Sequence, residues 1–155
     1  MKVIVCLDDN YGMLFNHRRQ SRDINVRRYI ADMCKGKVLW MTPYSARLFG
    51  GEMDYNISED CLLEAAAGEY CFIENKSLLP FEDYIEEITI FKWNRIYPAD
   101  MKFDIPLEEH GWKCISADEF AGNSHEKISV EVYSRACTDF GFSVSGSEEE
   151  NQIIT

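Results

Sequence analysis

Hydrophobic and polar residues form short alternating blocks along this chain, and the spacing within each block predicts a strand or a helix. Four nearly continuous apolar runs, rich in Val, Ile and aromatic residues, are typical of strands buried on both faces. They predict strands over residues 2–8, 37–42, 69–75 and 87–93. Residues 9–21, which follow the first strand, are expected to form a loop. Apolar residues at helical spacing, together with residues typical of helix ends, predict helices over residues 22–34, 43–49, 58–68 and 79–86.

The last third of the chain changes from this alternation to a run of strands. Residues 94–106 are an extended connection punctuated by prolines, and we expect strands over 111–120 and 125–135, joined by a polar turn. Strands that alternate with helices and then follow one another predict an α/β fold with a mostly parallel central sheet, an antiparallel C-terminal edge and flanking helices. We expect one domain over residues 1–138 and a loose acidic tail over 139–155.

Composition narrows the classes of function. Hydrophobic residues make up 46% of the 155 residues, which excludes a disordered chain. The net charge of −11 argues against broad nucleic-acid or anionic-membrane binding, but it leaves room for a local basic pocket or for a protein partner. No transmembrane run and no signal peptide is expected. The six cysteines are scattered without a CxxC pair, as in a cytoplasmic protein with reduced thiols.

Positive charge gathers at one place in this acidic chain, the segment FNHRRQSRD over residues 15–23. One interpretation is a site for a small anionic ligand or a partner, because arginine forks bind phosphates and carboxylates in pairs of hydrogen bonds. The other is a solvated loop whose arginines pair with nearby carboxylates. Its candidate binding residues are His17, Arg18, Arg19 and Arg22.

The order of these elements and several short stretches resemble dihydrofolate reductase over about residues 1–135. The resemblance is carried by KVIVCLDDNYGM, with Gly12 at the family's loop glycine, and by YPADMKF, GWKCIS and NSHEKISVEVYSR in succession. It implies the same single-domain α/β fold in a shortened and divergent member. It also implies that Gly12 lies beside a ligand site, and that Asp23, allowing a shift of one residue, matches the family's catalytic carboxylate.

Two turns depart from the pattern by which the family holds the phosphates of NADPH. Thr42, Pro43, Tyr44 and Ser45 stand where the family has a Gly-Arg-x-Thr turn, so the arginine contact to phosphate is lost. Residues 73–76, Ile-Glu-Asn-Lys, stand where adjacent glycines let a helix N-terminus approach the pyrophosphate. These departures predict that no cofactor binds.

The same residues leave other chemistry open. Asp23 is either a proton donor or ring anchor, as the resemblance implies, or a carboxylate favoured by the positive end of a helix. The three histidines, His17, His110 and His125, lack the spacing of metal ligands, so no metal is expected. The sequence contains no GxSxG pattern, which is typical of one group of Ser-His-Asp enzymes.

Three functions follow from these features, and the residues alone leave open whether the protein is an enzyme. The first is a non-reductase binding or regulatory module, with the basic loop as an anion or partner site in the cleft. The second is a divergent NAD(P)H-dependent reductase of a pteridine-like or other heterocyclic substrate, with Asp23 at its centre. The third, with the least support, is a nucleotide-processing or nucleic-acid-processing protein.

Overall fold

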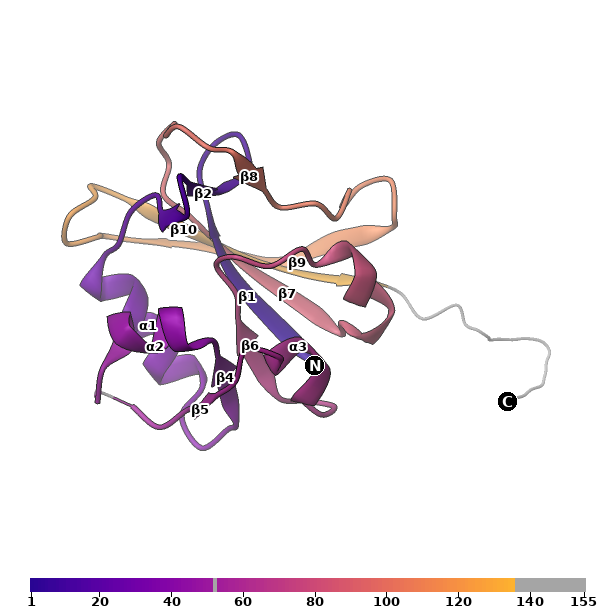
Figure 1. Ribbon diagram of the computed structural model, residues 1–155. Helices are drawn as coiled ribbons and strands as arrows, with labels where there is room; N and C mark the ends of the chain where they lie inside the picture. The colour runs from indigo at the N-terminus through magenta and orange to yellow at the C-terminus, as the bar shows by residue number, and fades with distance from the viewer. Residues whose placement is uncertain (52, 136–155) are drawn as a thin grey trace.

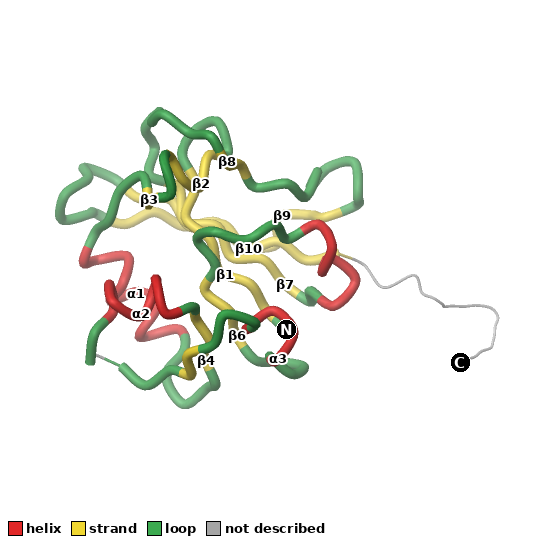
Figure 2. The backbone as a smooth tube through the Cα atoms, in the orientation of Figure 1, coloured by secondary structure: helices red, strands yellow, loops and turns green. Residues whose placement is uncertain are grey.

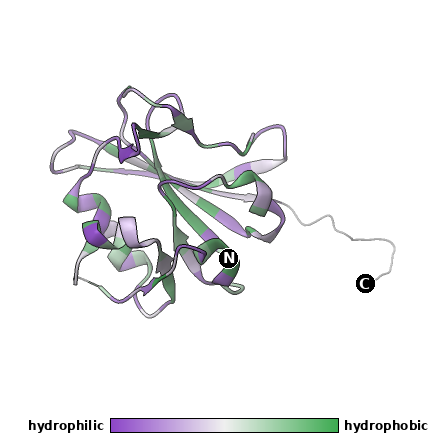
Figure 3. Ribbon diagram, viewed as in Figure 1, coloured by the Kyte–Doolittle hydropathy of each residue, from purple (hydrophilic) through white to green (hydrophobic). Residues whose placement is uncertain are grey.

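The apolar run at the N-terminus forms the central strand of the molecule (Figure 1). The computed structural model describes residues 1–51 and 53–135, so the expected acidic tail and the end of the expected domain lie outside the described residues. Strand β1 (Lys2–Leu7) pairs in parallel with β6 (Tyr70–Phe72) on one side and with β7 (Glu87–Lys92) on the other. Figure 3 shows β1 as hydrophobic along most of its length, as a strand covered on both faces must be.

The predicted fold class is confirmed. Seven strands form one sheet in the order β5-β4-β6-β1-β7-β10-β9. Strands β4 (Leu39–Met41) and β5 (Asn56–Ile57) extend the parallel part. Strands β9 (Trp112–Phe120) and β10 (Ile128–Arg135) are antiparallel and form the C-terminal edge.

Helices cover both faces of the sheet, as Figures 1 and 2 show. Helices α1 (Ile24–Met33) and α2 (Pro43–Phe49) pack on the face that carries Ile4. The short helix α3 (Cys61–Glu64) and residues around the 3₁₀ helix η1 (Leu79–Tyr84) pack on the face that carries Val3 and Val5. Because neighbouring strand residues point to opposite faces, the continuous apolar run of β1 supplies both cores.

One expected loop is instead a small sheet, and this expectation was wrong. Residues 9–21 contain β2 (Gly12–Phe15) and β3 (Arg18–Arg19), which form a three-stranded sheet with β8 (Met101–Lys102) in the order β3-β2-β8. Asn16 and His17 have φ values of 53° and 62°, so a two-residue turn with left-handed residues joins β2 and β3. Asparagine tolerates this left-handed conformation, so Asn16 could have indicated a hairpin turn in the sequence. The polar composition of the segment favoured a loop instead.

The helix expected over residues 58–68 is also much shorter than predicted. Asp60, rather than Ser58, is the residue before α3, and the chain turns to an extended conformation at Ala65. Ser58 instead accepts a hydrogen bond from the Asp60 backbone N–H at 3.0 Å. The alanines that favoured a long helix stand in the turn that leads into β6.

No helix in the described part of the chain is long and apolar enough to cross a membrane. The five cysteines within residues 1–51 and 53–135 are free, and Cys114 is exposed while Cys34, Cys61 and Cys71 are buried.

The central position of β7 predicts where the stability of the fold is concentrated. Ile90 has no exposed surface, whereas Ile115 on β9 is 60% exposed. Replacing Ile90 by alanine leaves a cavity between the layers, and we expect Ile90→Ala to lower the free energy of unfolding by about 2–5 kcal/mol. Ile115→Ala is the matched control and should cost less than about 1 kcal/mol. Urea unfolding followed by circular dichroism measures both; equal losses would contradict this layering.

Candidate functional site

The candidate site lies where the carboxyl ends of the parallel strands face helices α1 and α2. Cys6 comes from the end of β1, Glu74 follows β6, and Trp93 follows β7. This edge of a parallel sheet is where open α/β folds bind their ligands. The enclosed cavity there measures only about 10 Å³, because side chains of the protein fill most of the cleft.

Asp23 lies at the centre of this site and is almost completely buried. It is the N-cap of α1, and its Oδ1 accepts a hydrogen bond from the Asn25 backbone N–H at 2.9 Å. Its other hydrogen bonds join the helix to a distant loop. Oδ2 accepts from the backbone N–H groups of Asn123, Ser124 and His125 at 2.9, 2.8 and 3.1 Å.

The loop over residues 121–127 closes onto Asp23 because a glycine lets it do so. A Cβ atom on Gly122 would lie 2.5 Å from the His125 carbonyl oxygen and 2.8 Å from Asp23 Oδ2. Both are closer than any side chain tolerates. The expected polar turn is thus confirmed in position, and its glycine is required by close packing rather than by an unusual backbone angle.

The His125 side chain continues the network away from Asp23. Its Nδ1 lies 3.0 Å from Asp23 Oδ2, and its Nε2 lies 3.0 Å from Ser21 Oγ and 3.1 Å from Tyr97 Oη. The imidazole stacks on Trp93, with ring centres 4.7 Å apart. The Ser124 hydroxyl also lies 3.2 Å from Nδ1, and His125 is only 4% exposed, so five neighbours fix the orientation of a buried ring.

These contacts determine the charge of Asp23. Burial alone would raise the pKa of its carboxyl group, but the hydrogen bonds from the Asn123 backbone and the His125 ring, and those from Asn25 and Ser124, outweigh it. The pKa of Asp23 is therefore well below its usual value. An ionised carboxylate holds α1 and the 121–127 loop together.

A second network fills the part of the cleft between β6 and α2. Arg19 donates from Nε to Glu74 Oε2 at 2.8 Å and from Nη2 to Glu74 Oε1 at 3.0 Å. Ser45 Oγ donates to the same Oε1 at 2.7 Å. The guanidinium lies 4.4 Å from the centre of the Tyr44 ring, and the Arg19 backbone N–H donates to Tyr44 Oη at 2.9 Å. Arg19 and Glu74 are thus a bidentate ion pair with both partners held in place.

The remaining predicted binding residues lie in different surroundings. His17 and Arg18 are exposed at the end of the β2–β3 turn, and Arg22 is exposed beside the cavity that it helps to line. Gly12 is explained by packing, since a Cβ atom there would lie 2.5 Å from Gln20 Nε2 and 2.7 Å from the Ala99 Cβ.

Sequence reasoning missed several residues of this site: Ser21, Arg27, Tyr97 and His125, which line the cavity or its polar network. Arg27 in α1 has a buried Nε that finds no hydrogen-bond acceptor within the described residues. Only the NSH stretch, already noted for its resemblance, marked His125 in the sequence.

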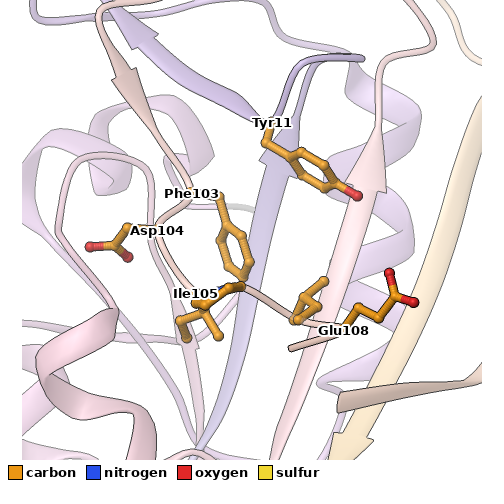
Figure 4. A pocket seen from close by; sticks show the side chains of 7 residues that line it. Tyr11, Phe103, Asp104, Ile105 and Glu108 are labelled. Carbon is orange, nitrogen blue, oxygen red and sulfur yellow. The ribbon is translucent and has the colours of Figure 1, made fainter. Parts of the chain in front are cut away.

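Another hollow, of about 320 Å³, is lined by Tyr11 and residues 103–108, of which Phe103 and Ile105 pack on the face of the sheet that carries Val3 and Val5. Figure 4 shows Phe103 and Ile105 within it, with Tyr11 and Glu108 beside them. Asp104 points away, consistent with the hydrogen bonds that it accepts from the backbone of Leu78 and Leu79. Its lining is mostly apolar and carries no base beside a nucleophile, so the cleft between α1 and α2 remains the candidate site.

No group of three or more candidate metal ligands occurs in the part of the chain that the structure describes. Burial and then the charge of Glu74 raise the pKa of the Cys6 thiol well above its usual value. Cys6 is therefore a protonated thiol and a poor nucleophile.

Comparison with known proteins supports the fold alone. No model of a known protein family matches the sequence, and no curated protein matches it. Among solved structures, the chain is similar to the dihydrofolate reductase from Enterococcus faecalis complexed with NADP(H) and RAB-propyl. The TM-score is 0.61 at 10% sequence identity, over 86% of this chain and 95% of that chain. The protein thus has a dihydrofolate reductase-like α/β fold.

The lowered pKa of Asp23 predicts how the stability of the protein depends on this residue and on pH. Asp23→Asn removes a buried ionic acceptor, and we expect the free energy of unfolding at pH 7 to fall by about 1.5–3 kcal/mol. A carboxylate whose pKa is lowered on folding stabilises above its unfolded pKa, about 3.9, and loses that stabilisation as the pH falls further. The difference between wild type and variant should therefore shrink below about pH 4.

Asp32→Asn is the matched control, because Asp32 lies on the same helix and is exposed. Its free energy of unfolding should stay within about 0.5 kcal/mol of the wild-type value. Denaturant titrations at a series of pH values compare the three proteins. A loss in Asp23→Asn that persists unchanged into acid would show that the charge of Asp23 is not what stabilises the loop.

Proposed function

We propose that this protein is a non-reductase binding protein on a dihydrofolate reductase-like fold, with a site for a small anionic ligand at the rim of the cleft between α1 and α2. The observation that carries this proposal is the bidentate ion pair between Arg19 and Glu74. It occupies the region in which the resemblance places the phosphates of a dinucleotide.

The first argument concerns the cofactor. Glu74 is 8% exposed and fixed by Arg19 and by Ser45, whose hydroxyl lies at the start of α2. A pyrophosphate at this position would meet the charge of the Glu74 carboxylate and would have to displace its hydrogen-bond donors. Both effects are unfavourable, because a buried ion pair broken on one side leaves an unpaired charge.

The second argument concerns the substrate of a reductase. Both oxygens of Asp23 already accept hydrogen bonds from the chain, from Asn25, Asn123, Ser124 and His125. A heterocycle that uses this carboxylate as ring anchor would have to displace the loop over residues 121–127. The lowered pKa of Asp23 also makes it a poor proton donor at neutral pH.

The third argument concerns the positive charge that remains. Arg18, Arg22 and Arg27 make no ion pair within residues 1–51 and 53–135, although the whole chain has a net charge of −11. Arg22 and Arg27 line the cavity, and Arg27 has a buried Nε that lacks an acceptor. Because the enclosed cavity is about 10 Å³, the anion binds at its rim and not inside it.

The alternative is a divergent NAD(P)H-dependent reductase, and one observation favours it. The similar solved structure is a dihydrofolate reductase complexed with NADP(H), and the fold agrees over 86% of this chain. Direct binding of the cofactor separates the two functions.

Titration with NADPH tests the non-reductase function. Trp93 lines the cavity, so a cofactor that enters the cleft changes its fluorescence. We expect no saturable quenching up to millimolar NADPH, because Glu74 and Arg19 occupy the phosphate region. A dihydrofolate reductase titrated in parallel is the positive control, and free tryptophan corrects for absorption by the nucleotide. Saturation at micromolar NADPH would overturn the proposal in favour of the reductase.

Calorimetric titration with inorganic pyrophosphate tests the anion site. We expect Arg27→Ala to weaken binding about 10-fold or more, since a charge-assisted hydrogen bond contributes about 1.5–3 kcal/mol. Arg28→Ala is the matched control, because Arg28 is the exposed neighbour on the same helix and does not line the cavity. It removes the same charge and should change affinity less than 3-fold. Equal effects of the two variants would indicate a general surface charge effect instead of a site.

A further inference from the structure

The polar network beside the cavity contains a hydroxyl, an imidazole and a carboxylate in a line. Ser21 Oγ lies 3.0 Å from His125 Nε2, and His125 Nδ1 lies 3.0 Å from Asp23 Oδ2. We propose that these three residues are a Ser-His-Asp triad, with Ser21 as nucleophile, and that the protein hydrolyses small esters that carry a negative charge. Such triads are recognised by geometry and by the roles of their members, because they occur in several chain orders on unrelated folds.

Asp23 fixes the proton arrangement that a base requires. Burial would raise the pKa of Asp23, but hydrogen bonds, chiefly those from Asn123 and His125, lower it. The carboxylate is therefore ionised, and it accepts hydrogen bonds but does not donate one. In the proposed triad, Nδ1 of His125 carries the proton that faces Asp23, and the lone pair of Nε2 faces the hydroxyls of Ser21 and Tyr97. Stacking on Trp93 at 4.7 Å holds the ring in this orientation.

The three residues of the proposed triad differ in solvent exposure, and catalysis requires the nucleophile to be the accessible one. Asp23 and His125 are 3% and 4% exposed, whereas Ser21 is half-buried on the segment that leads into α1. The nucleophile is thus the member nearest to solvent. Cys6, the other nucleophile at the cavity, is a protonated thiol, because burial and then Glu74 raise its pKa.

Groups able to stabilise an oxyanion contact Ser21 or line the same cavity. The Tyr97 hydroxyl lies 3.5 Å from Ser21 Oγ and 3.1 Å from His125 Nε2. Arg22 and Arg27 line the same cavity as Ser21, and the buried Nε of Arg27 has no acceptor among the described residues. A positive group that lines the same cavity as the nucleophile is suited to the negative charge that develops on the carbonyl oxygen.

The reaction balances with water as the only co-reactant. Ser21 Oγ attacks the ester carbonyl carbon while its proton passes to His125 Nε2, and the carbonyl electron pair moves to oxygen. The bond to the alcohol oxygen then breaks, and the alcohol leaves with the proton from His125. Water repeats the sequence on the acyl-serine, giving the carboxylic acid and free Ser21. The cavity of about 10 Å³ beside Ser21 is close to the volume that one water molecule requires.

The prediction that the substrate is negatively charged rests on the proposed anion site, whereas the prediction of the triad does not. An ester that bears a carboxylate or phosphate places that group against Arg27 and Arg22 at the rim. A neutral reagent therefore tests the triad alone, and a charged substrate used beside it tests the anion site.

Diisopropyl fluorophosphate is the neutral reagent, because it forms a stable bond to an activated serine with loss of fluoride. We expect mass spectrometry to find one adduct on the intact protein and to place it on Ser21 by peptide mapping. Ser21→Ala should abolish labelling, and His125→Gln should slow it by about 100-fold. Ser116→Ala is the matched control, because Ser116 is an exposed serine on β9 that does not line this cavity. It should label within 3-fold of the wild-type rate.

Two results would overturn the triad. One is no adduct on Ser21 in protein whose circular dichroism shows that it is folded. The other is an adduct on Tyr97 or on another residue that survives in Ser21→Ala.

Hydrolysis of p-nitrophenyl acetate and of mono-p-nitrophenyl succinate tests the charge preference. Wild type should favour the succinate, Arg27→Ala should lose that preference, and Arg28→Ala should keep it. Labelling of Ser21 without any preference for the succinate would leave the triad standing and contradict the anion site. A preference for the succinate that persists in Ser21→Ala would contradict the triad.

Discussion

The architecture of the cleft depends on one buried carboxylate, that of Asp23. It terminates helix α1, and it receives the backbone N–H groups of a loop about 100 positions away, with Asn123 as the first donor. An unpaired ion in this place would be strongly unfavourable, but each oxygen has donors within hydrogen-bonding distance. The charge of Asp23 is therefore met by the backbone N–H groups of the loop and by the His125 ring. Arg22 and Arg27, which line the same cavity, make no ion pair with it within the described residues.

The neighbouring arginines Arg18 and Arg19 show how strand geometry divides a cluster that looks uniform in the sequence. Successive residues of β3 point to opposite sides, so Arg19 reaches Glu74 in the cleft while Arg18 is exposed. Of the two explanations that the sequence left open, pairing with a nearby carboxylate thus applies to Arg19, and the anion site stays a prediction. Arg19 neutralises an internal acid. Arg18 and Arg22 remain available at the surface.

The fold could be predicted from the sequence much further than the site. Continuous apolar runs mark buried strands by themselves, and Pro43 and Asp23 mark the beginnings of α2 and α1 locally. The site depends on pairs of residues that are far apart in the sequence, and no local pattern of hydrophobic and polar positions indicates such pairs. Arg19 and Glu74 lie 55 positions apart, and Asp23 and His125 lie 102 apart. The β2–β3 hairpin was missed because two exposed polar residues at its turn read as loop, although left-handed backbone at both is what a tight hairpin needs.

The two networks of the cleft have a common consequence for its electrostatics. Every acid that lines the cavity is engaged: Glu74 by Arg19 and Ser45, and Asp23 by the loop and by His125. Arg22 and Arg27 line the same cavity without an ion pair among the described residues. The two arginines balance the two acids of the lining, so the cleft is less acidic than the chain as a whole, whose net charge is −11. If the proposed function holds, the anion is a small one, because a large anionic ligand would also meet the negative charge of the rest of the chain.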